Sequence, residues 1–145
     1  MKALKGFKLI LEELRRPQHW LPWKMAPLIY ITTLLSHLVG ASAGRESTAL
    51  QMSTSLADKL GQWFSLAQSQ RSLILRAGLS GGFAAALGTP WAGMVFGVEL
   101  LQTTQWKKWN FKLFFTCCIA SWSAWSITLL LKTPHFEALS IEPPD

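Results

Sequence analysis

Uncharged, mostly apolar stretches dominate the hydrophobic pattern of this chain, and short charged segments separate them. Three stretches carry no charge at all, at residues 25–44, 77–98 and 113–131. Each approaches the roughly 20 residues that a helix needs to cross the hydrocarbon core of a bilayer. The pattern therefore predicts a helical chain that is embedded in a membrane.

Helical periodicity and chain-breaking residues divide the sequence further. Apolar residues recur at helical spacing over residues 4–16, and Pro17 ends that predicted helix. Residues 27–38 form a second predicted helix, and residues 47–64 form a third that mixes apolar with polar positions. Because a mixed surface suits contact with protein better than contact with lipid, we expect the third helix to pack inside protein.

The second uncharged stretch is rich in glycine, and we expect it to break at residues 88–90, Gly-Thr-Pro. Irregular backbone at membrane depth is tolerated only where it is buried in protein or lines a polar cavity. We therefore expect a packed pair of helices here, not one lipid-exposed span. Small residues at a spacing of four allow helices to approach closely, and two such pairs occur. They are Gly78 with Gly82, and Gly93 with Gly97.

The third uncharged stretch predicts a conventional membrane-spanning helix. Its adjacent cysteines, Cys117 and Cys118, have no histidine or carboxylate at ligand spacing, and neighbouring cysteines rarely form an unstrained disulfide. We expect them to be small apolar helix residues, and we expect neither a metal site nor a cofactor. Residues 136–145 are predicted to form a disordered tail.

Composition and the placement of charge support a membrane location. The 145 residues are 50% hydrophobic and 15% charged, whereas about a quarter of a soluble domain is charged. The net charge is +6, but the basic residues and tryptophans flank the uncharged stretches, as they do at membrane interfaces. These features exclude a disordered chain, a disulfide-rich secreted domain and an ordinary soluble enzyme. The expected partner is the lipid bilayer, and not nucleic acid.

A turn of small residues opens the third predicted helix. Residues 40–44, Gly-Ala-Ser-Ala-Gly, precede Arg45 and Glu46. The first N–H groups of a helix have no intrahelical acceptor, and the helix dipole is positive there, so such a turn can bind an anion. A glutamate at this point is a tethered anion that can occupy the site. Spacing alone leaves open the plainer alternative that Glu46 suits a first helical turn and pairs with Arg45.

Two segments resemble motifs of a known transporter family. Residues 44–48 (GREST), followed by Gln51 and Met52, resemble the Gly-Arg-Glu-Gly-Pro segment of the voltage-gated chloride channel and chloride–proton antiporter (CLC) family. The likeness is closest to the branch that includes fluoride–proton antiporters. Residues 77–99 are similar to the family's Ala-Gly-rich helix, its Pro-x-Ala-Gly turn and the following helix that ends in glutamate. The resemblance covers residues 9 to about 136.

The resemblance implies an all-α, polytopic membrane protein with broken and re-entrant helices. The family's fold consists of two inverted halves, and this chain would hold part of the first half. A complete protein would be a homodimer in the inner (cell) membrane that moves chloride or fluoride, with proton coupling left open. Glu46 matches the family's gating glutamate. The other residues matched to the anion pathway are Gly44, Arg45, Ser47 and Thr48.

Several departures from the family's pattern bear on activity. Ser47 stands where the family has glycine, and Leu100 stands where proton-coupled members carry a glutamate for proton transfer. The chain is shorter than a complete member, and residues 6–8 do not match the upstream anion-site segment. A truncated, non-conducting membrane remnant, or a fragment that only pairs with other helices, therefore stays an alternative.

Residues 78–82 also satisfy the Gly-x-Ser-x-Gly pattern of a hydrolase nucleophile, with Ser80 at its centre. That motif needs a preceding strand, which the periodicity does not predict. An intramembrane serine protease would need a later histidine in the membrane, and His135 lies beyond the third stretch. We expect no enzyme, and keep the protease as a remote alternative. His37 and Glu99 are reserve candidates, because ionisable residues near membrane segments are often functional.

Overall fold

The computed structural model describes residues 6–15, 20–40, 45–100 and 111–131. All regular structure in these ranges is helical, which confirms the all-α prediction for this part of the chain. The predicted tail at residues 136–145 lies outside the described ranges. The helices are α1 (Gly6–Arg15), α2 (Met25–Leu38), α3 (Arg45–Trp63), α4 (Gln68–Leu87), α5 (Pro90–Glu99) and α6 (Phe111–Leu130).

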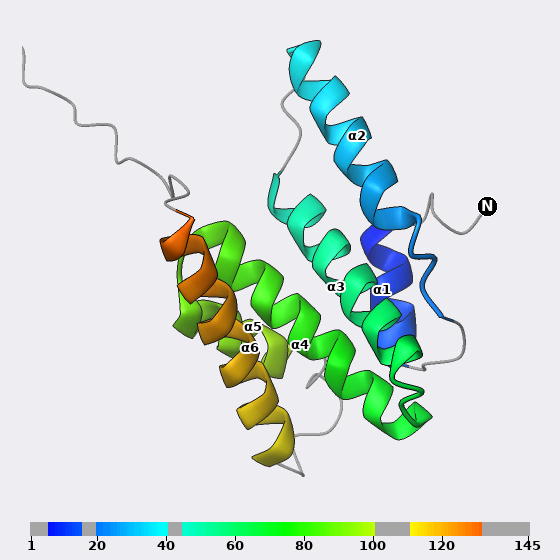
Figure 1. Cartoon of the computed structure of the whole chain (residues 1–145), viewed down its shortest axis with the longest axis vertical. Helices are drawn as coiled ribbons and strands as arrows, with labels where there is room; N and C mark the ends of the chain where they lie inside the picture. The colour runs from blue at the N-terminus through cyan, green and yellow to red at the C-terminus, as the bar shows by residue number, and fades with distance from the viewer. Residues whose placement is uncertain (1–5, 16–19, 41–44, 101–110, 132–145) are drawn as a thin grey trace, which may run out of the picture.

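Helix α4 is the central element of the fold. Helix α3 packs against one side of α4, and α5 and α6 pack against the other. Helices α2, α3 and α4 run up and down in alternation, while α6 follows the direction of α4 (Figure 1). The shorter α1 contacts α3 and α4. This arrangement places the start of α3 and the end of α4 at the same end of the bundle (Figure 1).

The glycine-rich stretch breaks where the sequence predicts. Gly88 adopts a left-handed conformation, with φ of 69°, which suits glycine because it has no Cβ. Thr89 is extended, and Pro90 begins α5, where its missing N–H costs nothing. The 20-residue α4 and the 10-residue α5 are therefore separate helices.

The other two uncharged stretches give helices of different length. Among the described helices, only α6, with 20 residues, is long and apolar enough to cross a membrane. Helix α2 has 14 residues and ends in a turn at Val39 and Gly40, the latter with φ of 76°. At about 1.5 Å per residue, α2 spans about 21 Å, which is less than the hydrocarbon core. The first stretch is thus only partly a helix within the described residues.

Helix α3 reverses the usual distribution of polar and apolar side chains. Its large apolar residues Leu56, Leu60 and Trp63 are exposed, whereas Thr54 and Asp58 are fully buried. The polar face of α3 is packed inside protein as expected, whereas its apolar face is exposed within the described residues. The arrangement suits lipid, because apolar side chains lose nothing there while polar groups need partners within the protein.

Glycines allow α3 and α5 to approach α4 closely. A Cβ added at Gly78 would lie 2.6 Å from the Cβ of Ala57 on α3, and one at Gly82 would collide with Ser53. On the other side, a Cβ at Gly93 would lie 2.6 Å from the carbonyl oxygen of Ser80. A Cβ at Gly97 would lie 2.7 Å from the Ser80 Cβ. These contacts leave no room for a side chain at any of the four glycines.

Candidate functional site

The first turn of α3 carries the residues that the sequence analysis singled out for anion binding. Glu46 is the second residue of α3, and its side chain is exposed. Ser47 is also exposed, and its Oγ accepts a hydrogen bond of 3.0 Å from Nε2 of Gln51 one turn later. Gly44 lies outside the described residues. Arg45 begins the helix, but its side chain is not described.

Two contacts hold this turn against its neighbours. The hydroxyl of Thr48 is half-buried and lies 3.3 Å from the hydroxyl of Thr33 on α2. Leu50, two residues further along α3, is buried in a core that includes Leu75 and Leu79 of α4. The first turns of α3 therefore contact both α2 and α4, while the Glu46 carboxylate itself stays exposed.

The chemistry available at this turn favours negative charge. The N–H groups of a first helical turn have no acceptor within their own helix and point along its axis. The helix dipole adds about half a positive charge there. An anion that approaches the start of α3 can therefore bind without a basic side chain. The Glu46 carboxylate can occupy the same position, since it is attached to that turn.

The reserve residues lie at different places. His37 is half-buried on α2, one helical turn beyond Thr33, and its Nδ1 lies 2.7 Å from the Thr33 carbonyl oxygen. It thus belongs to the end of α2 that borders the Thr48 contact. Glu99 is exposed at the last turn of α5, and the adjacent Leu100 packs against the core around Leu79.

The sequence analysis missed a buried ionic cluster at the other end of α3. The Arg71 guanidinium donates from Nε to Oδ1 of Asp58 at 2.7 Å and from Nη2 to Oδ2 at 2.9 Å. Its Nη1 lies 3.3 Å from Oε2 of Glu13 on α1. The backbone N–H of Leu21 donates to Asp58 Oδ2 at 2.6 Å, and the Trp20 ring lies 4.6 Å from the guanidinium carbon.

Only Arg71 of this cluster gave a signal in the sequence, as the one charged residue between Lys59 and Arg76. The Arg71 and Asp58 side chains are 1% and 0% exposed, and buried charges occur in proteins almost only as pairs. Their pairing across 13 positions, and with Glu13 across 58, needs the three-dimensional structure.

Ser80 is fully buried at the junction of α4, α5 and α6. Its Oγ lies 2.9 Å from the Gly93 carbonyl oxygen, 3.0 Å from that of Cys117 and 2.6 Å from the Ser121 Oγ. A hydroxyl has one proton, so Ser80 donates to one carbonyl at a time while Ser121 can donate to it. The Ser80 hydroxyl therefore has hydrogen-bond partners on both α5 and α6.

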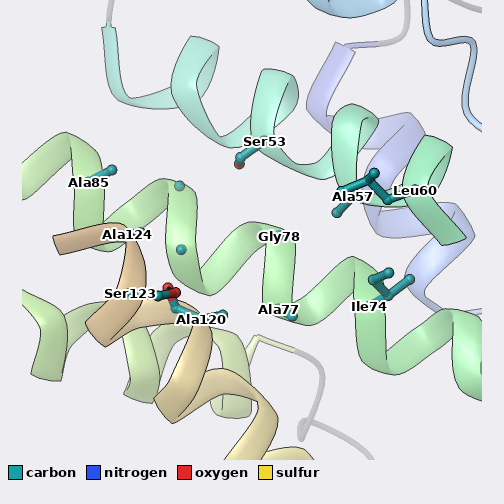
Figure 2. A pocket seen from close by; sticks show the side chains of 12 residues that line it. Ser53, Ala57, Leu60, Ile74, Ala77, Gly78, Ala85, Ala120, Ser123 and Ala124 are labelled. Carbon is teal, nitrogen blue, oxygen red and sulfur yellow. Dashed lines mark hydrogen bonds between the residues drawn. The ribbon is translucent and has the colours of Figure 1, made fainter. Parts of the chain in front are cut away.

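An open groove lies over α4, between α3 and α6 (Figure 2). Its volume is about 390 Å³, and small residues line most of it, including Gly78, Gly81, Ala120 and Ala124. Among the residues that the structure describes, no charged side chain lines this groove. Its two polar side chains, Ser53 and Ser123, both donate to backbone carbonyls of their own helices, and the groove is distinct from the first turn of α3.

Comparisons with known proteins agree with the motifs. The family model described as "Voltage gated chloride channel" matches residues 1–142. A protein of Pseudomonas syringae pv. tomato named "Chloride/fluoride channel protein" is 43% identical over 116 residues, which is 80% of this chain. "Chloride channel protein F" of Dictyostelium discoideum is 33% identical over 129 residues, or 83% of this chain. No solved structure matches at a significant level.

The chain is much shorter than these relatives. The matched region is 25% of the Pseudomonas syringae protein and 16% of the Dictyostelium discoideum protein. Most residues of both relatives therefore have no counterpart in these 145.

Proposed function

Because the chain belongs to the voltage-gated chloride channel family, we propose that it forms part of the anion pathway of a chloride or fluoride transporter. Glu46 is the gate of that pathway. The name of the Pseudomonas syringae relative supports the choice of anions. The protein is a multi-pass protein of the cell (inner) membrane and forms a homodimer when the pathway is complete.

The observation that carries this proposal is the position of Glu46. Its carboxylate is exposed on the first turn of a 19-residue helix, on a backbone held by the Thr33–Thr48 contact and by buried Leu50. A helix start favours an anion, and the carboxylate is the anion already attached to it. A transported anion must displace it, or wait until it is protonated and loses its charge.

The neighbouring residues have secondary roles in the pathway. Arg45 begins the helix, and Thr48 holds its first turn against α2. Ser47 adds a hydroxymethyl group at the backbone that an anion approaches, so it narrows the entrance. Protons act on this site through Glu46, whether or not their movement is coupled to that of the anion.

The experiment uses vesicles loaded with chloride or fluoride. One sample contains this chain alone, and the second contains it co-expressed with a polypeptide carrying the remainder of the Pseudomonas syringae relative. We call the second assembly the completed transporter. Anion sites in transporters with inverted halves need helix ends from both halves. Only the completed transporter should therefore release anions faster than protein-free vesicles, and the intact relative is the positive control.

Two results would contradict the proposal. No release from a completed transporter that is inserted as well as the intact relative would favour the alternative, a non-conducting fragment. Release by this chain alone that Glu46→Ala abolishes would instead show that the 145 residues suffice. The serine protease alternative has less support, because the Ser80 hydroxyl is fully buried among hydrogen-bond partners.

A further inference from the structure

We propose that Arg71 is a positioning residue for the Glu46 gate, and that it acts through Asp58 at the opposite end of α3. This inference rests on the proposed function of Glu46. The ion cluster of Arg71, Asp58 and Glu13 joins α4, α3 and α1, and the backbone of Leu21 joins it as a fourth chain segment. No residue of this cluster belongs to the anion pathway described above.

The geometry of the ion cluster fixes the orientation of Asp58, and with it that of α3. Arg71 binds both carboxylate oxygens of Asp58, at 2.7 and 2.9 Å, and a planar guanidinium fork fixes the orientation of its partner. Apolar packing is not directional, and a buried ion cluster is often no more stabilising than apolar residues of the same volume. The Arg71 guanidinium therefore contributes to the orientation of α3 and not to the stability of the bundle.

The same end of α3 also holds α2. Asp58 accepts the hydrogen bond from Leu21 N–H, and Ser55 Oγ donates to the Pro22 carbonyl oxygen at 3.2 Å. At the far end of this helix pair, Thr33 contacts Thr48 beside the gate. At one end, α3 is thus linked to the segment that leads into α2, and at the other end to α2 itself, while the ion cluster joins α3 to α4.

An unbroken helix transmits a change at Asp58 to Glu46. Helix α3 runs from Arg45 to Trp63 without interruption. At about 1.5 Å per residue, about 18 Å of helix separates Glu46 from Asp58. A tilt of about 5° at the ion cluster would therefore move the Glu46 end by about 1.6 Å. That displacement is large compared with the tolerance of a hydrogen bond at the gate.

The test measures position directly and does not depend on transport. Spin labels are placed at Glu46→Cys and Ile127→Cys in this chain, after Cys117 and Cys118 are replaced by alanine. Ile127 is 56% exposed on α6, at the end of the bundle where α3 begins. The distance distribution is recorded for the parent, for Arg71→Lys and for the matched control Arg76→Lys on the same helix. Thermal unfolding is recorded for each variant.

Arg71→Lys keeps the charge but loses the fork, so the mean distance should shift by about 2 Å or its distribution should double in width. Arg76→Lys should leave the distribution unchanged. An unchanged distribution in a folded Arg71→Lys variant would overturn the proposal.

If this variant does not fold, the apolar replacement Glu13→Leu/Asp58→Leu/Arg71→Met serves instead, since such replacements are often tolerated. The same displacement is expected, and its absence would overturn the proposal.

A second readout separates positioning from stability. In the completed transporter, Arg71→Lys should change the pH dependence of anion release, and Arg76→Lys should not. Lower thermal stability with an unchanged distance and an unchanged pH profile would mean that the ion cluster is only structural. If the label distance shifts but Glu46→Gln leaves the pH profile unaltered, the proposed gate fails while the mechanical coupling stands.

Discussion

The hydroxyl oxygens of Ser80 on α4 and Ser121 on α6 lie 2.6 Å apart, and both side chains are fully buried. The Ser80 hydroxyl also reaches the carbonyl oxygen of Gly93 on α5. One small polar side chain thus joins three helices at a point where Gly93 and Gly97 bring the backbone of α5 against α4. In a lipid-embedded helix bundle, small residues and hydroxyl contacts of this kind hold helices together.

Replacing Ser80 by alanine should destabilise the bundle. The Ser121 hydroxyl would lose its closest partner and keep only the Ser80 carbonyl oxygen at 3.4 Å, so the free energy of unfolding should fall by about 1 kcal/mol. The measurement is denaturant unfolding of the chain in detergent micelles. The matched control is Ser123→Ala on α6, whose exposed hydroxyl bonds only to the Ala120 carbonyl of its own helix. Equal, small losses for both variants would argue against the three-helix junction.

Adding one methyl group at Gly93 should separate α5 from α4. Its Cβ would lie 2.6 Å from the Ser80 carbonyl oxygen and 2.9 Å from the Ala84 backbone nitrogen, and backbone atoms cannot move aside cheaply. Overpacking of this kind costs about 1–3 kcal/mol, so Gly93→Ala should unfold at lower denaturant concentration.

The control for Gly93→Ala is Gly61→Ala. The added Cβ would lie 3.2 Å from the Ile74 side chain, which can shift, and alanine favours a helix by about 1 kcal/mol over glycine. Gly61→Ala should therefore be neutral or stabilising. A Gly93→Ala variant as stable as this control would mean that α5 is not packed closely on α4.

Cysteine accessibility should show the break between α4 and α5. In a background without native cysteines, a single cysteine at Thr89, which is exposed, should react with a water-soluble reagent. Cysteines at Leu79 and Ala84, both fully buried, should stay protected. Val95, which is 45% exposed on the apolar α5, is the control for a lipid-facing position. Uniform protection from residue 78 to residue 98 would instead indicate one continuous lipid-exposed span.

Local signals in the sequence predicted much of this fold. Gly88 and Pro90 give the break because each has a backbone preference that acts without tertiary contacts. The third uncharged stretch, residues 113–131, predicts α6 because length and apolarity alone define a membrane-spanning helix. Only the family motifs suggested a role for Glu46, which spacing alone left open, and that role stays a prediction.

The interior of the bundle could not be predicted in the same way. Asp58 pairs with Arg71, and Glu13 joins them, through contacts that depend on how three helices meet. The exposure of Leu56 and Trp63 on α3 was also not predicted, because a mixed pattern of polar and apolar residues does not say which of them face outward. Ser80 drew attention only as part of a hydrolase-like motif, whereas its hydroxyl joins three helices.

Replacing Ser47 by glycine should raise the rate of anion movement in the completed transporter. The side chain is exposed on the first turn of α3, next to Glu46, and its removal opens the backbone that the anion approaches. The measurement is the initial rate of chloride or fluoride release at one pH. Gln51→Ala is the control, because it removes the hydrogen-bond partner of Ser47 but leaves its hydroxymethyl group in place. A rate for Ser47→Gly at or below the parent's would contradict a narrowed entrance.

The central claim is that the Glu46 carboxylate competes with the anion at the start of α3. Anion release by the completed transporter is measured at about pH 4 and about pH 7.5, which span the protonation of an ordinary carboxylic acid. The variants are the parent, Glu46→Gln, which is neutral and nearly the same shape, and Glu99→Gln, an exposed carboxylate on α5. The parent and Glu99→Gln should release anions several-fold faster at the lower pH, and Glu46→Gln should release them at similar rates at both. If Glu46→Gln keeps the parent's pH response, Glu46 is only a first-turn helix residue and the proposed gate is wrong.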